Sequence, residues 1–391
     1  MNNKTYYYGK HSLDSTDVNQ VLKSMYSGFL SQGDQLEIFQ EKVAQYCGIQ
    51  YCLAVSNGTA ALHLAATALD LKPGDIAWTT PLTFVATANA LRYSGAEVDF
   101  VDIDPDTFNL SPNFFAKKLE TALKENKLPR VVVPVHFAGQ SCEMEKLASI
   151  AKKYGVKIIE DACHALGGKY QGQKIGNCKF SDVTVFSLHP VKSITAGEGG
   201  LILTNDKRLF HKMKQMRSHG LAKNPPLVNG QSEPWRIEMM QEGFNYKITE
   251  MQCALGISQM GKLDIFLSKR KKLVEAYRAR LKRAGLSFQS EIASSESAYH
   301  LMLVQFDFKY LGVSRRALFD RLKEKNIHLA IHYLPVHMHQ FYLNIKNRDG
   351  CFPHAETYYS STFSFPLYSD LEVDDVDYIC SVLLDFLDGK G

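Results

Sequence analysis

A carboxylate and a lysine stand where they could do chemistry together. Asp161 ends the apolar run VKIIED, so its carboxylate is expected at the end of a buried strand. A buried carboxylate needs a partner, either a structural Arg or Lys or the cationic group of a ligand. Lys192 follows the next apolar run, which ends at Ser187. Adjacent parallel strands would bring Asp161 and Lys192 to the same edge of a sheet, where ligands bind.

A turn that could bind phosphate precedes both residues. Asn57, Gly58 and Thr59 stand between a strand-like run and the helical pattern TAALHLAATALDL. A helix start offers unpaired N–H groups and the positive end of the helix dipole, and glycine allows close backbone approach. Ser187 could add a hydroxyl to the same phosphate. An ordinary helix cap is the alternative for the turn, and a capping serine is the alternative for Ser187.

Together these features match the needs of pyridoxal 5′-phosphate. Its phosphate is held at a helix N-terminus, its ring nitrogen is kept protonated by a carboxylate, and its aldehyde forms a Schiff base with a lysine. Phe84, in PLTFVAT, would stack on the ring, although a single Phe at such a junction also suits a core position. The combination of these features is much more specific for pyridoxal phosphate than any one feature alone.

Alternating strand and helix patterns must position these residues. Strand-like runs lie within 51–58, 76–82, 96–104, 128–139 and 156–161, and helical patterns separate several of them. This order predicts parallel βαβ units, an α/β fold with a mostly parallel central sheet flanked by helices.

The pattern changes near Met251. Residues 251–285 read as one long amphipathic helical stretch that leaves the first unit. Short strands within 300–308 and 328–337 and a helix within 314–326 follow. We therefore predict a large cofactor-binding domain, residues 1–261, and a smaller C-terminal α/β domain, residues 262–391.

Several longer motifs resemble the DegT/StrS family of sugar-nucleotide aminotransferases, which have the aspartate-aminotransferase type of fold (fold type I). The resemblance runs along almost the whole chain and is carried by SNGTAAL, PLTFVATANAL, EDACHALGGKYQGQKIG, FSLHPVKSITAGEGGLILTND, MRSHGL and GFNYKITEMQCALGISQM. Within the family, LSQGDQ, FVATANALRYSGAEVDFVDID, HPVKSITAGEGG and IHYLPVHMHQFY look most like the enzymes of pseudaminic acid biosynthesis. Those enzymes aminate C4 of a UDP-linked 4-keto-6-deoxy sugar.

The resemblance implies a role for each matching residue. It makes Lys192 the Schiff-base lysine, Asp161 the partner of the pyridine nitrogen and Phe84 the stacking ring. It also implies L-glutamate as amino donor and a homodimer with shared active sites, because Asn245 would reach the phosphate of the other subunit's cofactor. The phosphate would be held by Gly58, Thr59 and Ser187, and the UDP-sugar pocket would be lined by Tyr8, Ser31, Gln32, Lys247 and His332.

Two positions need comment. Lys247 stands where relatives often carry Arg. The lysine offers a phosphate only a point charge, whereas an arginine would make a bidentate contact. His164, three residues after Asp161, either touches the ring or only packs as a buried histidine.

Other function classes fit less well. Some relatives are sugar dehydratases with histidine at the Schiff-base position, but Lys192 occupies it here. A non-catalytic protein on this fold is expected to lose Lys192 or Asp161, and both are present. A nicotinamide-dependent enzyme is disfavoured because the first strand-turn-helix lacks the three-glycine fingerprint.

Composition limits the partners. The 391 residues carry a formal net charge of +4, too small and evenly spread for a nucleic-acid binder. We expect no secretory signal, because the first residues contain neither an apolar h-region nor a cleavage site, and no apolar run is long enough for a membrane span. The eight cysteines are scattered without C-x-x-C spacing, so we expect no metal site and free thiols in the cytoplasm.

Overall fold

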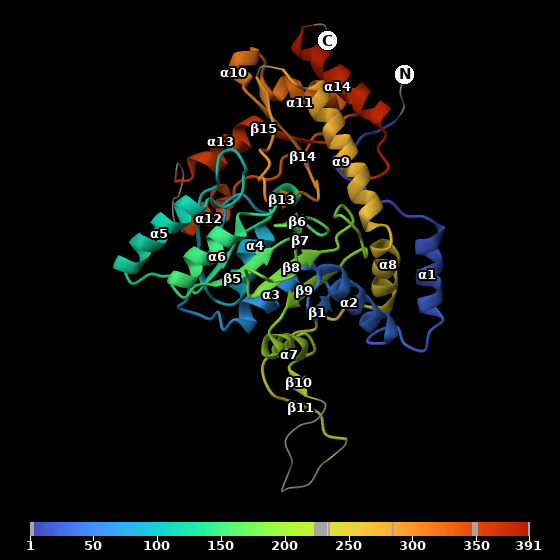
Figure 1. Cartoon of the computed structure of the whole chain (residues 1–391), viewed down its shortest axis with the longest axis vertical. Helices are drawn as coiled ribbons and strands as arrows, with labels where there is room; N and C mark the ends of the chain where they lie inside the picture. The colour runs from blue at the N-terminus through green and yellow to red at the C-terminus, as the bar shows by residue number, and fades with distance from the viewer. Residues whose placement is uncertain (1–3, 223–232, 234, 284, 346–350, 390–391) are drawn as a thin grey trace.

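The computed structural model describes residues 4–222, 233, 235–283, 285–345 and 351–389. Within these residues a central sheet of seven strands is covered by helices on both faces, and a smaller α/β part stands at one end (Figure 1).

The central sheet is mostly parallel, as the sequence predicts. In sheet order its strands are β1 (Tyr51–Val55), β9 (Gly200–Thr204), β8 (Val183–Ser187), β5 (Lys157–Asp161), β4 (Val131–Val133), β2 (Ile76–Thr79) and β3 (Glu97–Phe100). Only β9 is antiparallel to its neighbours β1 and β8, and the remaining pairs are parallel. The carboxyl ends of β8 and β5 therefore lie side by side, with Asp161 paired to Val185.

Alternating side chains along the strands build a core on each face of the sheet. Leu53 packs in one cluster and its neighbour Ala54 in the opposite one, because successive strand residues point to opposite faces. The first cluster is covered by α3 (Gly58–Ala68), α4 (Val85–Tyr93) and α7 (Lys207–Met216). The opposite face is covered by α2 (Asp34–Cys47), α8 (Glu250–Met260), α5 (Pro112–Lys124) and α6 (Met144–Lys153).

The sequence predicts one continuous helical stretch over residues 251–285, and this prediction is wrong. The chain forms α8 and then α9 (Leu263–Arg280), with Gly261 and Lys262 between them. The ammonium of Lys262 lies 2.7 Å from carboxylate oxygens of both Asp14 and Asp17. This pairing ties the junction between the two helices to the N-terminal segment.

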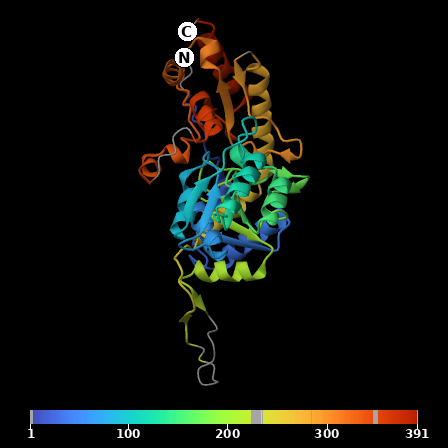
Figure 2. The ribbon, with the colours of Figure 1, turned by 90° about the vertical axis from the view of Figure 1, so that its left-hand side faces the viewer.

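Helix α9 leads into the smaller part, which has its own core (Figure 2). Its sheet consists of β12 (Leu286–Ser287), β14 (Met302–Phe306) and β15 (Thr362–Phe365), and its helices include α10 (Phe308–Leu311), α11 (Arg315–Glu324) and α14 (Val373–Leu387). Tyr6 is fully buried in this core and bridges to Ile327. The division at residues 261 and 262 stays a prediction, and Tyr6 shows that the N-terminal segment also packs on the C-terminal part.

The strand expected within 328–337 is also wrong. Ala330 makes a single bridge to Ser364, and the chain then enters a short 3₁₀ turn, η2 (Val336–Met338). Pro335 precedes this turn and has no N–H with which to continue a sheet ladder. The segment thereby leaves His332 and Tyr333 free of a ladder and able to face a cavity.

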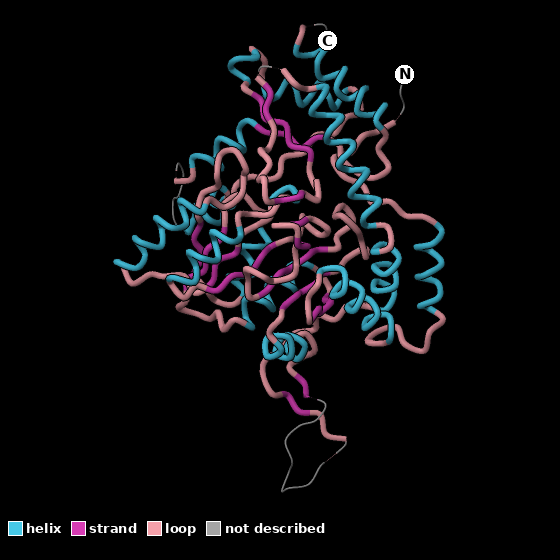
Figure 3. Tube along the Cα trace, in the orientation of Figure 1, coloured by secondary structure: helices cyan, strands magenta, loops and turns pink. Residues whose placement is uncertain are grey.

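Peripheral elements complete the described fold (Figure 3). The strands β10 (Leu221–Ala222) and β11 (Glu238–Met239) pair in an arm that projects from the body below α7. The other elements are α1 (Ser15–Met25), η1 (Phe137–Gly139), β6 (Lys169–Tyr170), β7 (Gln173–Lys174), β13 (Ser295–Glu296), α12 (Gln340–Ile345) and α13 (Pro353–Ser361).

Candidate active site

The start of α3 forms a cup at the carboxyl edge of the sheet. Asn57 caps the helix, its side-chain oxygen accepting the N–H of Ala60 at 2.8 Å. A methyl group placed on Gly58 would stand 3.0 Å from the Cβ of Ser187, so only glycine lets the helix start approach β8 this closely. Gly58, Thr59 and Ser187 line one cavity. Free helix N–H groups and a nearby hydroxyl suit a phosphate.

Asp161 ends β5 and is 4% exposed. Its Oδ2 accepts the hydroxyl of Thr87 at 2.7 Å, and its Oδ1 accepts the main-chain N–H of Cys163 at 3.1 Å. Thr87 is itself 2.7 Å from the hydroxyl of Thr83. These contacts fix the carboxylate while each oxygen keeps a lone pair for a ligand N–H. The Thr83 and Thr87 contacts were missed from sequence; Thr83 precedes the N-cap residue Phe84 of α4, and Thr87 lies in the first turn of the helix.

Lys192 follows β8 in a loop and lines the same cavity as Asp161. Burial lowers the pKa of the Lys192 amine, although the negative charge of Asp161 opposes that shift. A lowered pKa makes a neutral, nucleophilic amine more accessible near neutral pH.

The cavity has a volume of about 650 Å³. Phe84 lies at its side, 55% exposed, with its ring centroid 5.8 Å from that of Tyr333. An exposed aromatic ring beside a cavity is available for a ligand, unlike a core phenylalanine. Other lining residues include Tyr8, Asn57, Cys163, His164, His189, Glu198, Tyr246, His300 and His332.

Three buried histidines form part of the wall. Burial and the charge of Lys192 lower the pKa of His332 to about 3, and the same causes depress the pKa of His164. Burial and then His164 lower the pKa of His300. His164 lies 3.1 Å from the Tyr333 hydroxyl, so it both packs and lines the cavity. His300 was missed from sequence because no motif marks it, whereas Tyr333 was missed although it follows His332 in the motif IHYLPVHMHQFY.

The predicted substrate residues, together with the predicted cofactor residue Asn245, divide into two groups. Tyr8 and His332 line the cavity, with ring centroids 4.7 Å apart. The second group is absent from the lining of this cavity and is made of Ser31, Gln32, Asn245 and Lys247. These four still lie near one another, since Ser31 bridges to Thr249 and Asn245 bridges to Ser218. Arg217, next to Ser218, donates a 3.0 Å hydrogen bond to Gln32.

The residues present fit pyridoxal phosphate. The Gly58 cup suits its phosphate, the buried Asp161 carboxylate suits a protonated ring nitrogen, and the desolvated Lys192 amine suits its aldehyde. A mostly parallel α/β sheet with these three groups at one cavity defines a pyridoxal-phosphate-dependent aminotransferase of the aspartate-aminotransferase fold.

Comparison with known proteins gives the family. The model of the DegT/DnrJ/EryC1/StrS aminotransferase family matches residues 11–384, so the chain belongs to this family. It is an enzyme, a sugar aminotransferase that uses pyridoxal 5′-phosphate.

Three relatives are similar along nearly their full lengths. The chain is 34% identical to the spore coat polysaccharide biosynthesis protein SpsC of Bacillus subtilis, over 98% of this chain and 97% of the relative. It is 33% identical to a UDP-4-amino-4,6-dideoxy-N-acetyl-β-L-altrosamine transaminase of Campylobacter jejuni, over 97% of both chains. The structure of Helicobacter pylori PseC, an aminotransferase involved in pseudaminic acid biosynthesis, superimposes with a TM-score of 0.90 at 29% identity, over 99% of this chain and 100% of that one.

None of the helices in the described ranges combines the length and apolarity that crossing a membrane requires. The described side chains also contain no group of three or more His, Cys, Asp or Glu that could hold a metal ion.

Proposed function

We propose that this enzyme transfers an amino group from L-glutamate to C4 of UDP-2-acetamido-2,6-dideoxy-β-L-arabino-hex-4-ulose. The product would be UDP-4-amino-4,6-dideoxy-N-acetyl-β-L-altrosamine, an intermediate of pseudaminic acid biosynthesis. The observation that carries the proposal is the full-length similarity to the Campylobacter transaminase of that name, together with the fold match to Helicobacter PseC.

Asp161 and Lys192 have different roles in the proposed reaction. When bound, pyridoxal phosphate supplies an aldehyde that takes up the amino group and a ring that withdraws electrons from the reacting carbon. Asp161, fixed by Thr87 and Cys163, keeps the ring nitrogen protonated. Lys192 Nζ takes the proton from Cα of L-glutamate in the first half-reaction. In the second half-reaction the same nitrogen delivers a proton to C4 of the sugar.

The part of the cavity wall formed by Tyr8 and His332 suits an uncharged sugar ring. Nδ1 of His332 lies 2.8 Å from the hydroxyl of Ser364, which fixes the imidazole beside Tyr8. With its pKa lowered to about 3, His332 is neutral at physiological pH and can exchange hydrogen bonds with sugar hydroxyls. We assign Tyr8 and His332 to the sugar, and Ser31, Gln32 and Lys247 to the nucleotide.

The assembly belongs to the same proposal. Asn245 is exposed on the described chain, outside the lining of its own cavity. We propose that it reaches the cofactor phosphate of a second subunit in a cytoplasmic homodimer with shared active sites. The division into a cofactor-binding domain, residues 1–261, and a small domain, residues 262–391, is part of this assignment.

A different sugar nucleotide is the alternative acceptor. SpsC, which is 34% identical, is described by a role in spore coat polysaccharide biosynthesis and not by pseudaminic acid. Perosamine-type 4-keto sugars and 3-keto sugars would use the same cofactor residues. A sugar dehydratase is less well supported, because Lys192 occupies the position where such relatives carry histidine.

A competition among acceptors tests the proposal. The purified enzyme is loaded with pyridoxal phosphate and L-glutamate and is offered the UDP-linked L-arabino 4-ulose, a GDP-linked 4-keto-6-deoxy mannose and a dTDP-linked 3-keto-6-deoxy glucose. We expect the UDP-linked sugar to have the highest kcat/KM by about 100-fold, since hydrogen-bonded sites reject mismatched polar groups strongly. A higher kcat/KM for either competitor overturns the acceptor assignment and leaves the aminotransferase class intact.

A further inference from the structure

A second carboxylate is buried directly behind Asp161. Glu160 precedes it in β5 and is 6% exposed. Because strand side chains alternate, Asp161 faces the cavity and Glu160 faces the opposite side of the sheet. Asp161 lines the cavity and Glu160 does not.

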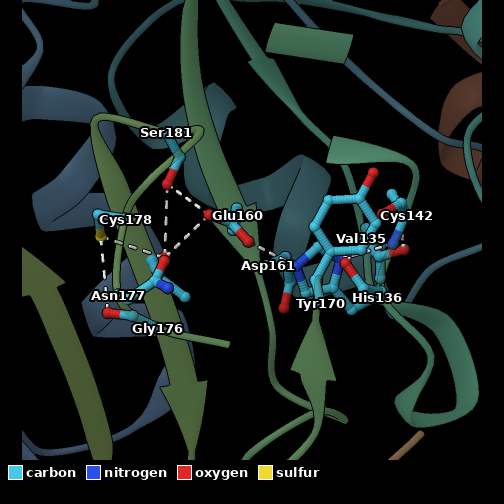
Figure 4. Close-up of polar contacts among 12 residues, drawn as sticks. Val135, His136, Cys142, Glu160, Asp161, Tyr170, Gly176, Asn177, Cys178 and Ser181 are labelled. Carbon is cyan, nitrogen blue, oxygen red and sulfur yellow. Dashed lines mark hydrogen bonds and ion pairs between the residues drawn. The ribbon is translucent and has the colours of Figure 1, made fainter. Parts of the chain in front are cut away.

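Glu160 is held by three donors (Figure 4). Nε2 of His136 donates to Oε2 at 2.7 Å, and the hydroxyls of Ser181 and Thr184 donate to Oε1. Ser181 and His136 stand on either side of the carboxylate. Burial would raise the pKa of Glu160, but the hydrogen bonds from His136 and from the two hydroxyls outweigh burial and lower it. Removing one of these donors would leave the buried carboxylate partly without hydrogen bonds, which costs free energy.

The histidine of this pair contacts Asp161 through its backbone. The N–H of His136 donates to the main-chain oxygen of Asp161 at 3.0 Å, and the N–H of Asp161 donates to the oxygen of Pro134 at 3.0 Å. The His136 ring is fully buried, and its Nδ1 accepts the N–H of Cys142 at 3.2 Å. Both ring nitrogens are therefore used, so the ring cannot turn without breaking a bond.

The same residue also begins the cavity wall. His136 leads into η1, where Phe137 packs against the rings of His164 and Tyr333 at centroid distances of 6.0 and 6.3 Å. The oxygen of Ala138 accepts the N–H of His300 at 2.9 Å. A shift of His136 would move the Asp161 backbone and this wall together.

We propose that His136 and Glu160 are positioning residues for Asp161, a pair that fixes the carboxylate where the ring nitrogen of the cofactor must lie. The proposal rests on the cofactor role of Asp161 and not on the identity of the sugar. Its failure is therefore distinguishable from failure of the acceptor assignment.

The test measures cofactor binding with Glu160→Gln, Asp161→Asn and the double variant. Apoenzyme is titrated with pyridoxal phosphate, and the Kd and the visible absorbance maximum of the bound cofactor are recorded. Removing a partner that orients a functional group typically costs about tenfold, so Glu160→Gln should raise the Kd by about that factor and shift the absorbance maximum. In the Asp161→Asn background, Glu160→Gln should change the Kd by less than about twofold. Two substitutions that both act through Asp161 are not additive.

A matched control separates positioning from stability. His337, which is fully buried, and Glu356, whose side chain is 23% exposed, form another pair, with 2.9 Å between Nε2 and Oε1, outside the cavity lining. Glu356→Gln should lower the melting temperature without changing the Kd or the absorbance maximum. The proposal is overturned if Glu160→Gln behaves like this control, or if its effect is equally large with and without Asp161. If Glu160→Gln does not fold, Ser181→Ala removes one donor only, and an unchanged Kd and spectrum in that variant overturn the proposal.

Discussion

Single residues in this cavity are tuned mainly by burial. Burial lowers the pKa of Lys192, His332 and His164 because water is excluded, and the charge of Lys192 lowers the pKa of the two histidines further. Asp161 is the counter-charge among them, and its two oxygens are already engaged by Thr87 and Cys163. The result is a site in which the amine can lose its proton while the ring partner stays fixed.

The depressed pKa of His332 has a consequence for stability. Its folded pKa of about 3 lies below the ordinary value of 6.5, so between these two pH values the unfolded chain binds more protons than the folded one. The contribution of His332 is therefore present above pH 6.5 and is lost as pH falls toward 3. The free energy of unfolding should decrease on acidification through this window, with His332 contributing up to about 1.4 kcal/mol per pH unit.

Urea unfolding of the wild type and of His332→Gln at several pH values checks this expectation. Glutamine can keep a hydrogen bond to Ser364 but does not titrate. The variant should show a shallower dependence on pH than the wild type. Equal slopes for the two proteins would show that His332 is not held in the neutral form by the fold.

The strands that end at the cavity could be predicted from the sequence. Apolar runs ending in Asp161 and Ser187 indicated parallel strands, and parallel neighbours must bring their carboxyl ends together. The break between α8 and α9 could not be predicted, because it depends on Lys262 meeting Asp14 and Asp17 from a distant segment. His300 reaches the cavity through the packing of the C-terminal part, which no local pattern encodes.

The start of α3 gives a prediction at the scale of an element. Asn57→Asp should keep the cap, since aspartate also accepts the N–H of Ala60, but it adds a negative charge beside the cofactor phosphate. The melting temperature should stay near that of the wild type, while the Kd for pyridoxal phosphate should rise by about tenfold or more.

Asn57→Ala is the matched comparison for the helix cap. It should lower the free energy of unfolding by about 1 kcal/mol because the cap bond is lost. Unchanged cofactor affinity in Asn57→Asp would contradict a phosphate site at this helix.

At the scale of the whole molecule, the shared active site can be tested by complementation. Lys192→Ala and Asn245→Ala subunits are each expected to be impaired as homodimers. In a mixed dimer, one site combines the intact Lys192 of one subunit with the intact Asn245 of the other. Random mixing should restore about a quarter of the wild-type activity, because half of the dimers are mixed and each has one intact site.

The control for complementation mixes Lys192→Ala with Asp161→Asn. Lys192 and Asp161 line the cavity of the same chain. In a mixed dimer, one site therefore lacks Lys192 and the other lacks Asp161, and activity should not return. If Asn245→Ala behaves like this control, Asn245 acts within its own subunit and the shared-site proposal is wrong.

Transfer of labelled nitrogen tests the central claim most directly. The enzyme is incubated with pyridoxal phosphate, ¹⁵N-labelled L-glutamate and UDP-2-acetamido-2,6-dideoxy-β-L-arabino-hex-4-ulose, and the sugar product is analysed by mass spectrometry and by NMR. We predict an amino sugar that carries the label on C4 with the wild type, and no such product with Lys192→Ala. An unlabelled deoxy sugar, a label on a carbon other than C4, or undiminished product with Lys192→Ala would contradict the account.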